Sequence, residues 1–174
     1  VALKKNSILP LSTSWLLYWR GISQQFVNPF EARATLERVY SCFVAEQDVM
    51  GQLMTASAII DIVFFLREGL HTIVQWIEVL QKYLATNFVF PLASMEARVL
   101  SSIFSVQIYM CPQDAQLPRY SDRLVTLLDS NLDINQKVLI SVNLINYCTN
   151  ISGDLAACDR IRAYIKPLIS SPEV

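Results

Sequence analysis

Apolar side chains recur along most of this chain three or four residues apart, the spacing that places them on one face of an α-helix. Eight segments show this pattern, separated by polar residues or prolines suited to helix ends. The chain has four glycines and no Asn-Gly, Asp-Gly or Gly-Gly pair, so it offers almost no tight turns for a β-sheet. The sequence therefore predicts an all-α fold.

Capping residues set the expected bounds of these helices, because a side-chain oxygen there can accept a hydrogen bond from a first-turn N–H group. The expected caps, in chain order, are Ser12 or Thr13, Asn28, Asp48, Thr72, Ser94, Asp133 and Asp154, and the sixth helix begins near Leu117. The third helix is expected to run to about Arg67-Glu68 and to stop at Gly69, the fifth at Met110, the seventh at about Asn150 and the eighth at about Ile169. Short turns make consecutive helices antiparallel.

Charged residues alternate between helices. The second, fourth, sixth and eighth helices carry most of the charges, whereas the first, third, fifth and seventh are apolar nearly all round. The third, VMGQLMTASAIIDIVFFL, holds one charged residue, and VLISVNLINYCTNI of the seventh holds none. A helix that is apolar on every side must be covered on every side. The alternation predicts antiparallel helical hairpins stacked as a short tetratricopeptide-like α-solenoid of about eight helices.

We expect one helical-repeat domain over residues 1–174. The chain starts with VALKK, without an initiator Met, and ends with ISSPEV just after a helix, which favours a domain excised from a longer protein.

The charge balance argues against direct binding to nucleic acid. Fourteen basic and fifteen acidic residues give a net charge of −1, so no long-range field attracts DNA, RNA or an anionic membrane. The stretches without a charged residue are shorter than the roughly 20 residues of a membrane span, and the N-terminus lacks a clean signal peptide. We expect a cytoplasmic protein.

The cysteines do not form a metal-binding or redox pattern. Cys42, Cys111, Cys148 and Cys158 include no C-x-x-C pair, and His71 is the one histidine. We expect four reduced, mostly buried thiols and no metal or other cofactor. The chain also has no G-x-S-x-G nucleophile motif and no Gly-rich phosphate loop, so no catalytic residue is assigned.

Small and polar residues form narrow stripes on two of the apolar helices. Together with Asp61, the members considered as a partner or ligand face are Arg98, Ser101 and Ser105 on the fifth helix, and Gln136, Asn143, Asn146 and Asn150 on the seventh. In a solenoid such stripes can line a concave binding surface. They can equally allow close helix packing, with the amides hydrogen-bonded between helices. Both interpretations stay open.

Asp61 is the single charged residue of the third helix and lies among Ile59, Ile60, Ile62 and Val63. Burying an ionised carboxylate is costly unless it is paired. The simpler interpretation is partial exposure or a salt bridge to an arginine of a neighbouring helix. The alternative is a charge that lines a ligand pocket.

Three segments resemble the helical-repeat regions of large bacterial regulatory proteins. They are EARATLERVYSCFVAEQDVMGQLMTASAIID, QWIEVLQKYL with its Trp76, and NQKVLISVNLINYCTNISGDLAACDRI, within residues 29–169. They are similar to the tetratricopeptide-like sensor arms of MalT-type and LuxR-type activators and related signalling ATPases. The resemblance implies a non-catalytic arm that binds a small-molecule inducer or a protein partner, including other domains of its own chain.

We therefore expect a non-catalytic module for protein–protein interaction or inducer sensing within a bacterial transcriptional or signalling regulator. Two alternatives are a small helical enzyme that uses carboxylates in an inter-helix cleft, and a structural oligomerisation domain such as a homo-dimer. The enzyme requires two acids that converge in a closed pocket, whereas the module requires an open grooved surface.

Overall fold

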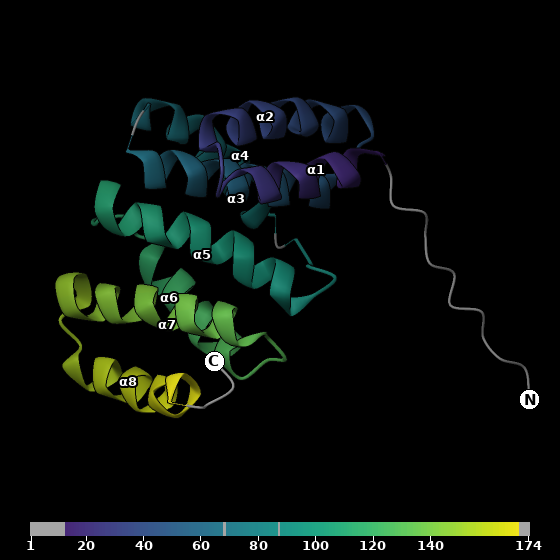
Figure 1. Cartoon of the computed structure of the whole chain (residues 1–174). Coiled ribbons are helices and arrows are strands. Elements are labelled where there is room, and N and C mark those ends of the chain that lie inside the picture. Colours follow the sequence, from purple (N-terminus) through teal and green to yellow (C-terminus); the bar gives the residue numbers. More distant parts are fainter. Residues whose placement is uncertain (1–12, 68, 87, 171–174) are drawn as a thin grey trace, which may run out of the picture.

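The computed structural model describes residues 13–67, 69–86 and 88–170, and over these ranges the chain is all-α, with eight α-helices and no strand (Figure 1). The helices are α1 (Thr13–Gln24), α2 (Pro29–Ala45), α3 (Val49–Leu66), α4 (Ile73–Leu84), α5 (Ala93–Met110), α6 (Leu117–Leu128), α7 (Ile134–Tyr147) and α8 (Leu155–Ile169). A 3-10 turn, Leu70–Thr72, precedes α4, and a π-helical turn, Cys148–Ser152, follows α7. The predicted all-α class is confirmed.

Four of the predicted N-caps are confirmed, and all four carry Asn or Asp. The side chains of Asn28, Asp48, Asp133 and Asp154 each accept a hydrogen bond from the backbone N–H three residues further on, at 3.2, 2.8, 3.0 and 2.8 Å. Each bond satisfies one N–H group that has no partner within its helix. These short polar side chains therefore fix where α2, α3, α7 and α8 begin.

Of the two hydroxyl caps predicted inside the chain, Thr72 stands in the N-cap position of α4 but makes no side-chain cap bond, and Ser94 is wrong. The Thr72 hydroxyl donates back to the Gly69 carbonyl oxygen at 2.8 Å, so it closes the 3-10 turn rather than capping α4. Helix α5 begins at Ala93, with Leu92 in the cap position and no side-chain cap bond, which places Ser94 inside the first turn. A hydroxyl can satisfy its hydrogen bond locally in several ways, so its position alone does not mark a helix start.

Two predicted helix ends also differ from the structure. Helix α3 ends at Leu66, and Arg67 rather than Gly69 adopts the left-handed conformation that closes it, with φ 56°. Helix α7 ends at Tyr147, and the predicted continuation to Asn150 is the π-helical turn. Of the two caps considered for the first helix, Ser12 lies outside the described residues. Residues 1–5 and 171–174, used for the expectation of an excised domain, lie outside them too.

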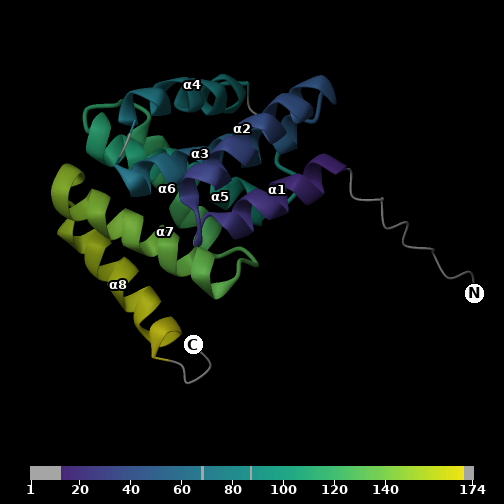
Figure 2. The same ribbon diagram turned by 45° about the horizontal axis from the view of Figure 1, so that its top comes forward.

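The helices pack as two layers. Each helix contacts the next one along the chain, and α3, α5 and α7 also contact one another in order, with a smaller contact between α1 and α3. Figures 1 and 2 show α1, α3, α5 and α7 as one row, and α4 and α6 lie behind this row in the view of Figure 1. Gln136 near the start of α7 bonds to Ser94 near the start of α5, and Asn146 near the end of α7 bonds to Tyr109 near the end of α5. These two helices therefore run in the same direction.

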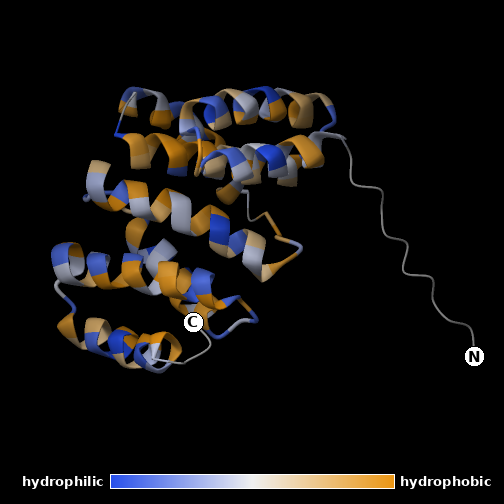
Figure 3. Ribbon diagram, viewed as in Figure 1, coloured by the Kyte–Doolittle hydropathy of each residue, from blue (hydrophilic) through white to orange (hydrophobic). Residues whose placement is uncertain are grey.

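The core lies along α3 and α5. Eleven residues of α3 and ten of α5 are buried, which exceeds every other helix described. Along α2 and α8 hydrophobic and hydrophilic residues alternate, as in helices that bury one side only (Figure 3). Packing on both sides thus explains why the sequences of α3 and α5 are apolar nearly all round.

Helices α1 and α7 do not follow this prediction. Leu16 and Trp19 of α1 are 58% and 53% exposed, and Leu139 and Val142 of α7 are 48% and 54% exposed. Helix α1 lies at one end of the row, and only α3 packs beside it there. The apolar sequences of α3 and α5 thus belong to helices that are mostly buried. Helices α1 and α7 have similarly apolar sequences, but each keeps apolar side chains exposed to solvent.

Helix α3 is also the one described helix with the length and composition of a membrane span. Of its 18 residues, 67% are buried against the rest of the protein. That burial is the ordinary environment of a core helix, and it is compatible with a soluble protein.

The prediction of mostly buried thiols is confirmed for two cysteines and wrong for the other two. Cys148 and Cys158 are buried, whereas Cys42 and Cys111 are exposed, and all four are free. Cys42 lies on the outer side of α2, and Cys111 follows the last residue of α5. The prediction rested on the general tendency of free cysteine to be buried, which Cys42 and Cys111 do not follow.

This difference predicts a two-phase reaction with a chromogenic disulfide reagent. Cys42 and Cys111 should react quickly in the native protein, and Cys148 and Cys158 slowly. Burial raises the pKa of the Cys148 thiol, so less of the reactive thiolate is present at neutral pH. Absorbance against time measures the two phases, and denaturant should merge them. Four fast thiols in the native state would contradict the structure.

Candidate functional site

Two residues of the polar stripe on α7 form hydrogen bonds to α5, at positions outside the α5 stripe. The Gln136 amide donates to the Ser94 carbonyl oxygen at 2.9 Å, and the Asn146 amide donates to the Tyr109 hydroxyl. Asn150 donates in turn to the Asn146 side-chain oxygen. Part of the predicted ligand face therefore holds the two helices together, as the packing interpretation expected.

Another part of the predicted face lines an open cavity between the same two helices. We call it the α5–α7 groove; its volume is about 420 Å³, and its lining residues are Ala97, Arg98, Ser101, Asp133, Asn135, Gln136 and Leu139. The structure thus brings together Arg98, Ser101 and Gln136 from the predicted stripes. Ser105 lies on α5 outside this lining, and its hydroxyl donates to the Ser102 carbonyl oxygen at 3.0 Å.

Several polar atoms on this side lack hydrogen-bond partners among the described residues. They are Nε of Arg98, Oε1 of Gln136 and Nδ2 of Asn143, all buried. A buried donor or acceptor without a partner costs about 1–3 kcal/mol. Arg98 and Gln136, which line the α5–α7 groove, therefore have hydrogen-bonding capacity that the described residues do not use.

Asp61 pairs with an arginine of a neighbouring helix, as the simpler interpretation expected. Its carboxylate lies 2.8 Å from a terminal nitrogen of Arg98, and both side chains are half-buried. Removal from water raises the pKa of Asp61, while the Arg98 charge and the Ser102 hydroxyl act in the opposite direction. Burial raises the pKa of Tyr18 of α1, which the nearby Arg98 charge lowers and the Asp61 charge raises. This cluster connects α1, α3 and α5 behind the groove.

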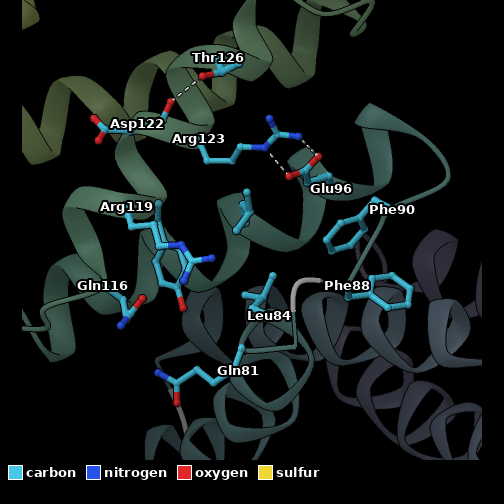
Figure 4. Close-up of a pocket in the computed structure, with 13 residues that line it drawn as sticks. Gln81, Leu84, Phe88, Phe90, Glu96, Gln116, Arg119, Asp122, Arg123 and Thr126 are labelled. Carbon is cyan, nitrogen blue, oxygen red and sulfur yellow. Dashed lines mark hydrogen bonds and ion pairs between the residues drawn. The ribbon is translucent and has the colours of Figure 1, made fainter.

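A cavity larger than this groove lies on the other layer and was not predicted. We call it the α4–α6 pocket; it has a volume of about 810 Å³, and α5 forms its floor. Helices α4 and α6 both pack on α5 but make at most marginal contact with each other, which leaves the space open. Its lining residues are Gln81, Leu84, Ala85, Phe88, Phe90, Glu96, Leu100, Gln116, Arg119, Tyr120, Asp122, Arg123 and Thr126 (Figure 4).

The two ends of this pocket differ in chemistry. Phe88 and Phe90 lie at one end, with ring centroids 5.1 Å apart in an edge-to-face arrangement. Arg119 lies at the other end, and Leu84 lies between (Figure 4). The pocket therefore has an aromatic end and a polar, cationic end.

One of the two arginines in the pocket is already neutralised. Arg123 makes two hydrogen bonds to the Glu96 carboxylate, at 2.6 and 2.7 Å, and these bonds raise its pKa. Arg119 has no hydrogen bond or ion pair to any described residue. Figure 4 shows the Asp122 carboxylate turned away from the pocket. The open charge inside the pocket is therefore positive.

Tyr120 adds a hydroxyl donor beside Arg119. The side chain is only 6% exposed and lines the pocket, yet its hydroxyl has no hydrogen-bond partner among the described residues. Burial raises the pKa of Tyr120, with a further upward shift from Asp114 and a downward shift from Arg119. The hydroxyl is thus protonated at neutral pH and can donate a hydrogen bond.

One feature of the sequence pointed to this pocket without being decisive. Arg119 and Arg123 are four residues apart on α6, so two like charges share one face, which destabilises a helix unless partners compensate. Glu96, the partner of Arg123, lies 27 residues earlier in the chain. No local pattern predicts that pairing.

The acids of the pocket do not form a catalytic pair. Glu96 is engaged by Arg123 and Asp122 points away, so no two free carboxylates converge in this cavity. Among the described residues, no group of three or more His, Cys, Asp or Glu side chains is placed to hold a metal ion. His71 lies exposed in the 3-10 turn before α4.

No protein-family model, curated protein or solved structure matches this chain. Functional conclusions for this protein therefore depend on the geometry of the groove and the pocket. The resemblance to bacterial sensor arms rests on the sequence segments alone.

Proposed function

We propose that this chain is a non-catalytic interaction module whose α5–α7 groove receives an extended segment of a partner protein or of another domain in its own polypeptide. The observation that carries the proposal is the groove itself, where unused polar groups border exposed apolar side chains of α7. We further propose a TPR-like solenoid in a cytoplasmic bacterial regulator, in keeping with the sequence resemblance.

The packing of the helices supports the solenoid. Successive pairs, α1 with α2 through α7 with α8, contact internally, and the first helices of the pairs contact one another in a row. The same direction of α5 and α7 is what a stack of similarly oriented hairpins produces. In such stacks the row of first helices is a common binding surface.

The chemistry of the groove favours a non-acidic peptide with apolar side chains. Arg98 is neutralised by Asp61, and the exposed Asp133 carboxylate at the start of α7 keeps its negative charge, which disfavours an acidic ligand. An extended backbone presents both C=O and N–H groups, which suit the donor of Arg98 and the acceptor of Gln136 after small side-chain rotations. Leu139 and Val142 offer apolar contact alongside.

The proposal predicts that a glutamate at either exposed apolar position of α7 weakens peptide binding. Peptides selected from a random display library on the wild-type protein should lose roughly tenfold or more in affinity with Leu139→Glu or Val142→Glu, because a charge would be desolvated against an apolar partner. Fluorescence anisotropy of the labelled peptides measures the change. Both positions are about half exposed, so the fold should be retained.

Val125→Glu is the matched control, since Val125 is 45% exposed on α6, in the other layer. It should leave peptide affinity unchanged. The proposal fails if selection yields no binder, or if selected peptides bind Val142→Glu as tightly as wild type. If Val142→Glu instead converts a dimer to a monomer in sedimentation velocity, this face is an oligomerisation surface.

A further inference from the structure

The α4–α6 pocket has the size and surface of a small-molecule site. Its volume of about 810 Å³ lies within the roughly 300–1,000 Å³ usual for ligand pockets. The apolar lining residues include Leu84, Phe88, Phe90 and Leu100. Phe88 and Phe90 lie at one end of the pocket, and Arg119 and Gln116 lie at the opposite end (Figure 4). A ligand that fills this space must therefore be apolar at one end and polar at the other.

The side chains at the polar end of the pocket determine the charge and the chemical type of the ligand group that can bind there. Arg119 offers a planar guanidinium that matches a carboxylate in shape and charge, and the Tyr120 hydroxyl offers one more donor. Neither group has a hydrogen-bond partner among the described residues. The neighbouring Arg123 is occupied by Glu96, so it does not compete for the same anion.

We propose that the α4–α6 pocket binds an aromatic carboxylate, with the carboxylate on Arg119 and Tyr120 and the ring against Phe88 and Phe90. Aromatic rings favour edge-to-face and offset contacts with other rings, and Phe88 and Phe90 already pair in that way. The site lies on the other side of α5 from the α5–α7 groove, and the inference does not depend on the proposed peptide binding.

Naphthoate is a suitable probe, and uncharged naphthamide is its matched neutral analogue. We expect saturable binding of one naphthoate per chain, with a dissociation constant on the order of 10⁻⁴ M for a ligand of this size. Arg119→Gln should weaken naphthoate binding by roughly tenfold to a hundredfold, and Tyr120→Phe by about fivefold. Tyr120→Phe removes a hydroxyl that no described residue uses, so it should not disturb the fold. The intrinsic fluorescence of the probe reports binding.

Two further variants locate the site. Ala85 is exposed at the mouth of the pocket, and Ala85→Trp should block both probes without altering the core. Arg160→Gln, at an exposed position on α8, should bind naphthoate like wild type. The proposal is overturned if wild type shows no saturable binding at millimolar naphthoate, if naphthamide binds equally well, or if Arg119→Gln has no effect. Peptide binding measured on these variants tests the groove separately.

Discussion

Phe104→Ala should lower the free energy of unfolding by roughly 3–5 kcal/mol, the usual loss for a fully buried phenylalanine. Phe104 is 0% exposed in the middle of α5, and its ring lies 5.3 Å from that of Tyr147 at the end of α7. The substitution would leave a cavity where α5 meets the C-terminal hairpin. Urea unfolding followed by circular dichroism measures the loss.

The position of Phe104 also predicts which helices lose most local stability in the Phe104→Ala variant. Amide hydrogen exchange should show protection falling most in α7 and α8, which reach the rest of the described fold through α5 and α6. Phe65→Ala is the matched control, because Phe65 is 83% exposed on α3. It should cost no more than about 0.5 kcal/mol. Equal losses for the two variants would contradict the packing of α5.

Gly51→Ala should destabilise the protein by roughly 1–3 kcal/mol, although alanine is the better helix former. A Cβ atom at Gly51 in α3 would lie 2.3 Å from Cδ1 and 2.4 Å from Cγ of Phe43. The Phe43 ring is fully buried and packs against Trp15 with centroids 5.0 Å apart, so it cannot easily move. Thermal and urea unfolding measure the loss.

A double-mutant cycle tests the cause. In a Phe43→Ala background the clash is gone, so Gly51→Ala should become stabilising by up to about 1 kcal/mol, through helix propensity alone. Gly153→Ala is a second comparison, because no atom lies within 4 Å of the new Cβ there. Its φ of 69° predicts a cost of about 1–2 kcal/mol from backbone conformation. If Gly51→Ala still lowers the free energy of unfolding in the Phe43→Ala background, the clash with the Phe43 ring is not the cause.

The parts of the fold that sequence predicted well are those decided locally. Asn28, Asp48, Asp133 and Asp154 mark helix starts, because their side chains reach only the next turn. Thr72 stands at the predicted cap position, but its hydroxyl bonds to an equally local alternative, the Gly69 carbonyl. Hydrophobic spacing gave the helices and the all-α class, but not the faces of α1 and α7 that stay uncovered.

The candidate sites were harder to predict, because each is assembled across several helices. The stripe residues Arg98 and Gln136 were singled out, yet periodicity could not decide between packing and binding. In the structure Gln136 bonds to α5 and also lines the open groove, together with Arg98. The pairing of Arg98 with Asp61 joins residues 37 positions apart in the chain. The α4–α6 pocket exists because α4 and α6 both pack on α5 but barely contact each other. No sequence pattern predicts that two helices will not pack together.

Helix α5 forms one wall of both cavities. Its residues Glu96 and Leu100 face the pocket, while Ala97 and Ser101, each one position further along, face the groove. The two proposed sites are therefore separated by the thickness of a single helix, about 10 Å. A ligand that shifts α5 from one side changes the shape offered on the other. Thermodynamic linkage then makes any such effect reciprocal, so a peptide in the groove would alter affinity in the pocket by the same factor.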